Sequence, residues 1–117
     1  NIFNGFADKA RLAAAREEGV RRALERTKTE TSVRFDVHVA VARLEAARAR
    51  EAVGRDAVAQ ARESRRIIRD RYEAGLTDVV SLTRSAEAVA QAEAQQIAAQ
   101  VAVVTETAAL QRALGRQ

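Results

Sequence analysis

The chain has 117 residues, of which 27 are alanine and only four are aromatic, and it contains no cysteine. Because alanine buries little apolar area, this composition cannot fill a thick globular core, and the lack of cysteine excludes disulfides and thiolate metal sites. The net charge of +4 arises from 20 basic and 16 acidic residues that alternate along the chain, as on solvated helix faces. A proline-free mixture of Ala, Glu, Arg and Leu predicts an all-α fold.

The first predicted element is a non-helical segment over residues 1–6, where Asn4-Gly5 forms a turn dipeptide. Asp8 suits the N-cap of a helix that we expect over about residues 8–73. The weakest part of this helix is residues 27–33, because β-branched and hydroxyl side chains disfavour helical backbone. We expect strain or a bend there.

An apolar seam with a rhythm of about 3.5 residues is predicted along the second half of this helix. It contains Val37, Val41, Leu44, Ala47 or Arg48, Glu51, Val58, Ala61, Arg65, Ile68 and Tyr72. The only strong interior stop follows at residues 74–77, where Gly75 suits the left-handed position after a helix end. Thr77 or Asp78 then caps a second helix over residues 78–114, which ends at Gly115.

Two apolar stripes run along the second helix. One holds Leu82, Ala86, Val89, Val103, Leu110 and Leu114, and the other holds Ala90, Ala94, Ile97, Val101, Val104 and Ala108. Two stripes predict two neighbouring helices. The whole chain is therefore expected to be one long antiparallel helical hairpin of the coiled-coil type. Since the second helix is the shorter one, residues 8–34 lack a partner inside the chain, and we expect them to pair with another copy or to break between Thr27 and Ser32 and fold back.

Three segments resemble the TolC-like outer-membrane efflux proteins. Arg71-Tyr72-Glu73-Ala74-Gly75-Leu76 is similar to the R-Y-x-x-G-L motif of that family. Residues 1–5, Asn-Ile-Phe-Asn-Gly, resemble the segment where the chain leaves the β-barrel, although Phe6 departs from the usual Gly-Gly. Residues 110–115 end in the Ala-Leu-Gly of the last long helix. The three motifs occur in the family's order and span essentially the whole chain.

The resemblance implies a wall segment, the second helical hairpin of a periplasmic α-barrel, in a passive conduit for drugs or other substrates. It implies a homotrimer that reaches the outer membrane through a β-barrel part missing from this chain, and that works with a periplasmic adaptor protein and an inner-membrane pump. Residues 1–6 would be the remnant of the barrel exit. The hairpin tip, Ala74, Gly75, Leu76 and Thr77, would dock the adaptor.

The resemblance also indicates where a pore constriction would lie. The family often has a D-V-L-D-A run just after the tip, and its two acidic places hold Ser81 and Arg84 here. Asp78 is the only carboxylate nearby, so an acidic gate is not expected, and a ring of Arg84 side chains would favour anions.

No enzyme, metal or cofactor is expected. His38, the only histidine, has no cysteine or carboxylate cluster at ligand spacing, and the serines have no histidine partner. Arg62, Arg65, Arg66 and Arg69 share a helix face, which we interpret as solvated, with Arg66–Asp70 and Arg69–Glu73 ion pairs. The resemblance implies adaptor contact near the tip as an alternative role for this face.

Two other functions stay open. The chain fits a periplasmic adaptor-type coiled-coil hairpin, although such a hairpin should lack the Asn-Gly segment and the Ala-Leu-Gly ending. The arginine face also fits a basic coiled-coil nucleic-acid-binding protein, although acidic residues interrupt it and no aromatic residues are interleaved for base stacking, so nucleic acid is not the expected partner.

Overall fold

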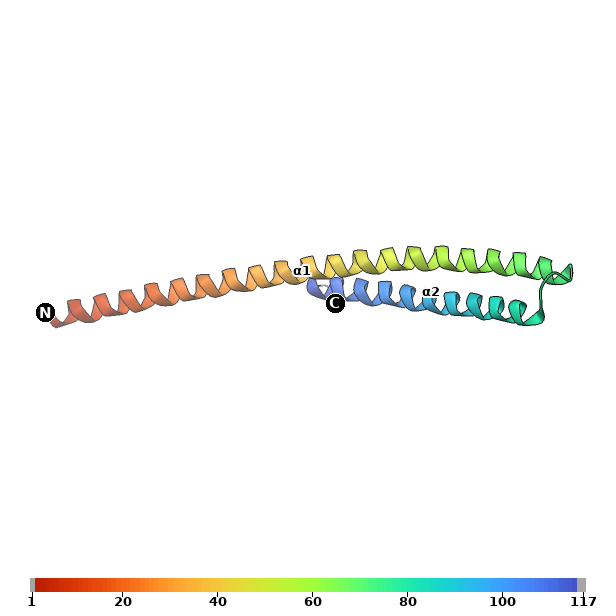
Figure 1. Ribbon diagram of the computed structural model, residues 1–117. Coiled ribbons are helices and arrows are strands. Elements are labelled where there is room, and N and C mark those ends of the chain that lie inside the picture. Colours follow the sequence, from red (N-terminus) through yellow and green to blue (C-terminus); the bar gives the residue numbers. More distant parts are fainter. Residues whose placement is uncertain (1, 116–117) are drawn as a thin grey trace. The chain divides into compact units, whose positions relative to one another are not determined.

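The computed structural model describes residues 2–115, which form two helices, α1 (Ile2–Glu73) and α2 (Val79–Ala113), joined by a short turn (Figure 1). Within this described range no strand occurs, so the all-α prediction is confirmed. The chain divides into two units. We call Asn1–His38 the arm and Val39–Gln117 the hairpin unit.

The arm is helical from Ile2 onward, so the expectation of a non-helical segment is wrong for residues 2–6. Asn4-Gly5 and Asp8 lie inside the helix, and Asp8 is not its N-cap. A helix pairs the backbone N–H and C=O groups within the segment and needs no neighbouring strand. The helical penalty of Gly5, roughly 1 kcal/mol relative to alanine, is tolerated in so long a helix. Asn1 lies outside the described residues.

Helical structure also continues through the threonine-rich stretch, so of the two alternatives for residues 8–34 the break between Thr27 and Ser32 is wrong. The Oγ1 atoms of Thr27, Thr29 and Thr31 donate to carbonyl oxygens four residues earlier, over 3.0, 2.9 and 2.9 Å. Hydroxyls that compete with helical hydrogen bonds elsewhere are here bonded within the helix.

All described side chains of the arm from residue 4 to residue 36 are exposed, including Phe6, Leu24 and Phe35. The arm therefore buries no core of its own. Its pairing with a second copy stays a prediction.

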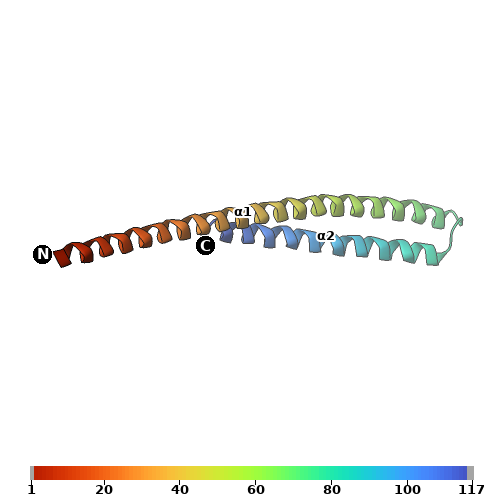
Figure 2. The ribbon, with the colours of Figure 1, turned by 60° about the vertical axis from the view of Figure 1, so that its left-hand side comes forward.

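In the hairpin unit, α2 runs antiparallel beside the C-terminal part of α1 (Figures 1 and 2). The buried apolar side chains are Ala40, Leu44, Ala47, Val58 and Val89. On α1 a row of buried or partly covered positions of this unit runs at steps of three and four residues from Ala40 to Ala61, and Ile68 follows seven residues later: Ala40, Leu44, Ala47, Glu51, Gly54, Val58, Ala61 and Ile68. We call this row and its counterpart on α2 the seam.

The seam differs from the predicted one at four places. Ala40 is buried, whereas Val41 is 37% exposed, and Gly54 belongs to the seam. Arg65 and Tyr72 were predicted in the seam but are exposed. A Cβ at position 54 would lie 3.4 Å from Cα of Gln96, so the two backbones approach closely at this point. Glycine at position 54 allows this close approach.

The two stripes of α2 have different surroundings. In the first stripe, Val89 is buried, Leu82 and Val103 are partly covered, and Leu114 is exposed. All six residues of the second stripe are exposed. One predicted neighbour of α2 is thus α1, and the second stays a prediction. We call the second stripe the back of α2.

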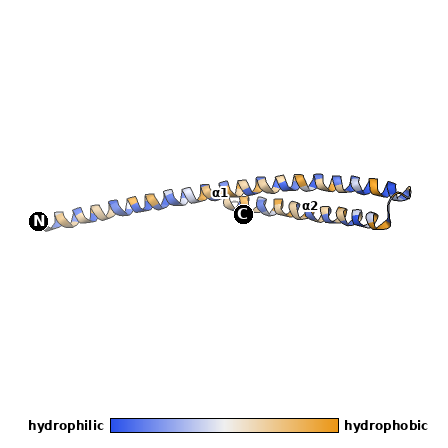
Figure 3. Ribbon diagram, in the orientation of Figure 1, coloured by the Kyte–Doolittle hydropathy of each residue, from blue (hydrophilic) through white to orange (hydrophobic). Residues whose placement is uncertain are grey.

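Hydrophobic and hydrophilic residues alternate turn by turn along both helices (Figure 3). Among the residues that the structure describes, no helix is both long and apolar enough to span a membrane.

Candidate functional site

The tip of the hairpin begins where α1 ends, and a Schellman motif ends this helix. The N–H of Leu76 donates to the carbonyl of Arg71 over 2.8 Å, and the N–H of Gly75 donates to that of Tyr72 over 3.0 Å. Gly75 has a φ of +75°, the left-handed conformation in which a Cβ is strained. The predicted position of the turn and the role of Gly75 are confirmed by this geometry.

Leu76 is the most exposed large apolar residue of the tip, with 73% of its surface accessible. In a Schellman motif the residue at this position usually packs on an apolar side chain one turn earlier. Here the residue at the start of the motif is Arg71, so Leu76 has no such partner within the motif. Leu76 thus lies exposed on a hydrogen-bonded turn, and Val79 and Val80 at the start of α2 are also more than half exposed.

Asp78 begins α2 as its N-cap. Its backbone is extended, with φ −94° and ψ 166°, and its Oδ1 accepts the N–H of Ser81 over 2.9 Å. The hydrogen bond from the Ser81 backbone, with a smaller effect of the positively charged Arg84, lowers the pKa of Asp78. The carboxylate is therefore engaged in capping, as predicted for Thr77 or Asp78.

The other two constriction candidates, Ser81 and Arg84, lie together at the start of α2. They line one hollow of about 350 Å³, and its other lining residues are Ala61, Ser64, Ile68, Ser85 and Ala88. Ser85 is buried, and its hydroxyl donates to the carbonyl of Leu82 over 2.7 Å. We call this side of the hairpin, with Ser64 on α1 and Ser81 and Ala88 on α2, the serine flank.

The opposite side of the hairpin carries a row of arginines that the sequence analysis missed. Arg48, Arg55, Arg62 and Arg69 each follow a seam residue by one position and recur every seven residues. Arg62 reaches across to Glu93 on α2, with Nη2 and Nε at 2.7 and 3.2 Å from its Oε1. Since Ser64 lies two positions from Arg62, about 200° around the helix, the two residues project on opposite sides of the seam. We call this row the basic flank.

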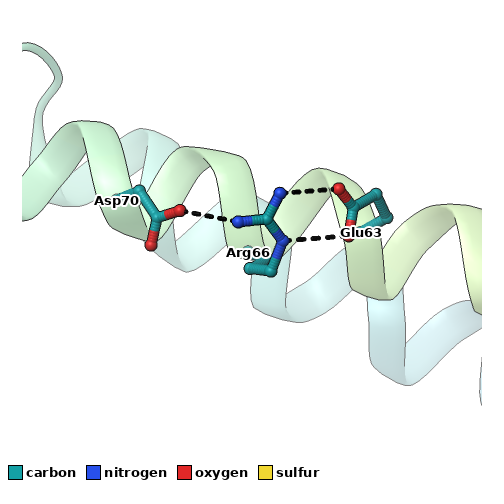
Figure 4. A network of polar contacts seen from close by, with 3 residues as sticks. All are labelled: Glu63, Arg66 and Asp70. Atoms are coloured by element: carbon teal, nitrogen blue, oxygen red, sulfur yellow. Dashed lines mark hydrogen bonds and ion pairs between the residues drawn. The ribbon is translucent and has the colours of Figure 1, made fainter.

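Sequence reasoning grouped Arg62 with Arg65, Arg66 and Arg69 because it followed a single helix face. In the continuous helix α1 the four arginines do share one face. Within that face Arg62 and Arg69 belong to the basic flank, and Arg66 lies in an ion-pair network on the outer side of α1 (Figure 4). A search of the sequence for arginines at seven-residue intervals beside the seam would have found this row. Such a search requires knowing which residues form the seam.

The network of Arg66 confirms one of two predicted ion pairs. Arg66 contacts Asp70 at 2.9 Å and Glu63 at 2.8 Å (Figure 4). The hydrogen bond and charge of Arg66 lower the pKa of Glu63, and those of Glu63 raise the pKa of Arg66. The predicted Arg69–Glu73 pair is absent among the described ion pairs.

No cluster of three or more metal-binding side chains occurs in the part of the chain that the structure describes. His38 is exposed on α1.

Comparison with known proteins gives one match that spans the chain. The sequence model of a family described as outer membrane efflux protein matches residues 1–116. No curated protein and no solved structure matches the chain.

Proposed function

Because the chain belongs to the outer membrane efflux protein family, we propose that it forms a wall segment of an efflux channel and docks a periplasmic adaptor through its tip turn. Members of this family are channels of the outer membrane that generally assemble as trimers and interact with adaptors. The match over residues 1–116 favours this function over an adaptor-type hairpin or a nucleic-acid-binding coiled coil.

The exposed back of α2 supports a place in a wall. Ile97, Val101 and Val104 are each more than half exposed, and no charged residue occurs from Ala94 to Thr105. Apolar side chains at helical spacing gain free energy when another helix covers them. A helix that packs on α1 with one side and on a neighbouring helix with the other is a wall element.

The observation that carries adaptor docking is the exposure of Leu76. The Schellman hydrogen bonds fix the turn, and Leu76 lies on it without an apolar partner in the motif. One such anchor contributes about 1–2 kcal/mol when a partner covers it, and several tips in an oligomer strengthen binding together.

The test is drug susceptibility of cells that carry the full-length protein with Leu76→Asp. We expect efflux to be lost while trimer assembly and helical content are unchanged, because Leu76 lies outside both helices and the seam. Leu76→Met is the matched control, since it keeps an apolar side chain of similar volume and should keep efflux. Full resistance of the Leu76→Asp strain with normal trimer would show that the turn only reverses the chain.

We further propose that Asp78, Ser81 and Arg84 lie at the constriction of the conduit. The ionised carboxylate of Asp78 accepts the N–H of Ser81, whereas Arg84 forms none of the described ion pairs. A ring of one Arg84 per protomer would attract anions and repel cations. In planar bilayers the assembled channel should prefer chloride over potassium, and Arg84→Glu should reverse this preference. An unchanged ion preference in that variant would remove Arg84 from the constriction.

A further inference from the structure

We propose that the basic flank is the docking surface for a helix that carries carboxylates at seven-residue spacing. The four arginines of the flank lie one position after Ala47, Gly54, Ala61 and Ile68. Because those four residues belong to the seam, the arginines stay in line along one side of the hairpin unit. The Cα atoms of successive arginines in the flank are about 10 Å apart along the helix axis.

The positive charge of the flank is only partly neutralised. Arg55 pairs with Glu51 on its own helix at 2.7 Å, and Arg62 pairs with Glu93 at 2.7 Å. Among the described ion pairs, none involves Arg48 or Arg69. Both side chains are exposed.

The neighbouring residues of α2 are mostly small or uncharged. On α2 the seam includes Ser85, Ala92, Ala99 and Glu106, which are buried or partly covered. The positions that follow them by one lie beside the basic flank, and they hold Ala86, Glu93, Gln100 and Thr107. Three of these are uncharged and none is aromatic. A helix lying there would meet arginines on one side and small or polar side chains on the other.

An acidic helix fits this surface better than a nucleic acid does. A helix with Glu or Asp every seventh residue repeats its charge at the same interval of about 10 Å as the arginine row. Nucleic-acid surfaces usually lack interspersed carboxylates such as Glu51 and Glu93, and they often add aromatic residues.

The outward position of the flank rests on the proposed function. The serine flank, with Ser81 and Arg84, lies on the opposite side of the hairpin. In a wall one helix thick, the two flanks face opposite sides. If the constriction residues face the conduit, the basic flank faces the periplasm, where a partner's helix can reach it.

The experiment measures binding of a fluorescent 28-residue helical peptide with Glu at every seventh position, by anisotropy, to the purified chain. Arg48→Gln with Arg69→Gln removes the two arginines that form no ion pair, so the fold should be retained, as circular dichroism will show. We expect the double variant to bind roughly fivefold to tenfold more weakly, from two rim-type ion pairs. Raised salt should weaken binding to the unmodified chain.

The matched control is Arg43→Gln with Arg50→Gln, which removes the same charge from the serine-flank side of α1. This control should bind within about twofold of the unmodified chain. A second probe, the same peptide with Gln in place of Glu, should not bind. Equal losses in both double variants, or equal binding of the two peptides, would overturn the proposal.

A third probe, a 20-base-pair DNA duplex, covers the other class of polyanion. Binding of this duplex more tightly than the Glu peptide, with loss in the Arg48/Arg69 variant, would assign the flank to nucleic acid and overturn the proposal. The peptide assay does not involve the tip. Normal efflux by Leu76→Asp together with intact peptide binding would therefore refute tip docking alone.

Discussion

Replacing Gly75 by alanine tests whether the tip turn depends on a left-handed backbone. A Cβ at this position would meet no atom within 4 Å, so the substitution changes backbone energetics and no packing. An L-residue at a φ of +75° costs roughly 1–2 kcal/mol. The lower backbone entropy of alanine in the unfolded chain offsets roughly 0.4–1 kcal/mol of this cost. We expect a net loss of about 1 kcal/mol in the free energy of unfolding.

The assay is urea unfolding of the purified chain, followed by circular dichroism. Gly75→Asn should lose less than Gly75→Ala, because asparagine tolerates the left-handed region. Gly19→Ala is the matched control: it also meets no atom within 4 Å but lies in helical backbone, where alanine is preferred by up to about 1 kcal/mol. It should increase the helical signal. Gly75→Ala with stability equal to or above that of the unmodified chain would refute a left-handed tip.

Three further predictions concern the seam, its flank and the N-cap. Val89→Ala removes two methyl groups at a buried seam position and should lower the free energy of unfolding by about 1.5 kcal/mol in the same urea assay. Val104→Ala, on the exposed back of α2, should change it by less than about 0.5 kcal/mol. A double-mutant cycle on Arg62 and Glu93, both partly exposed, should give a coupling energy of about 0.5 kcal/mol that falls in high salt, and no coupling would show that this pair does not form in solution. Because accepting a backbone N–H lowers the folded-state pKa of Asp78, its carboxylate stabilises α2 fully above its ordinary pKa of about 4 and loses this effect as the pH falls through the lower folded value. Asp78→Asn, which caps without titrating, should remove that part of the acid dependence, and an unchanged pH profile would contradict the capping role.

The tip was predictable because its determinants are local. Gly75 ends a helix wherever the chain must enter the left-handed region, and Asp78 accepts an N–H three residues later whatever the rest of the chain does. These two residues placed the turn correctly. The end of α2 near Gly115, which has a φ of +72°, follows from the same logic.

Which residues form the seam was less predictable, because this depends on how closely the backbones of the two helices approach each other. Ranking residues by size favoured Val41, whereas the antiparallel packing buries Ala40 and uses Gly54 against Gln96. The basic flank is defined only relative to that seam, so an error of one residue hides it. The non-helical segment failed over residues 2–6 for a different reason: the described residues 2–115 hold no strand beside which it could lie, and a helix pairs its own backbone groups.

The seam and the flanks together explain why so polar and alanine-rich a chain forms a defined structure. A hairpin with five buried apolar side chains has little burial to stabilise it, and the back of α2 leaves Ile97, Val101 and Val104 uncovered. Covering that back with a neighbouring helix adds burial without touching either flank. Residues on the flanks are then free of packing constraints, which is why one flank can hold Ser81 and the other a row of arginines. In such a wall, the seam and the covered backs of the α2 helices stabilise the assembly. The serine flank then faces what passes through the conduit, and the basic flank faces what binds from outside.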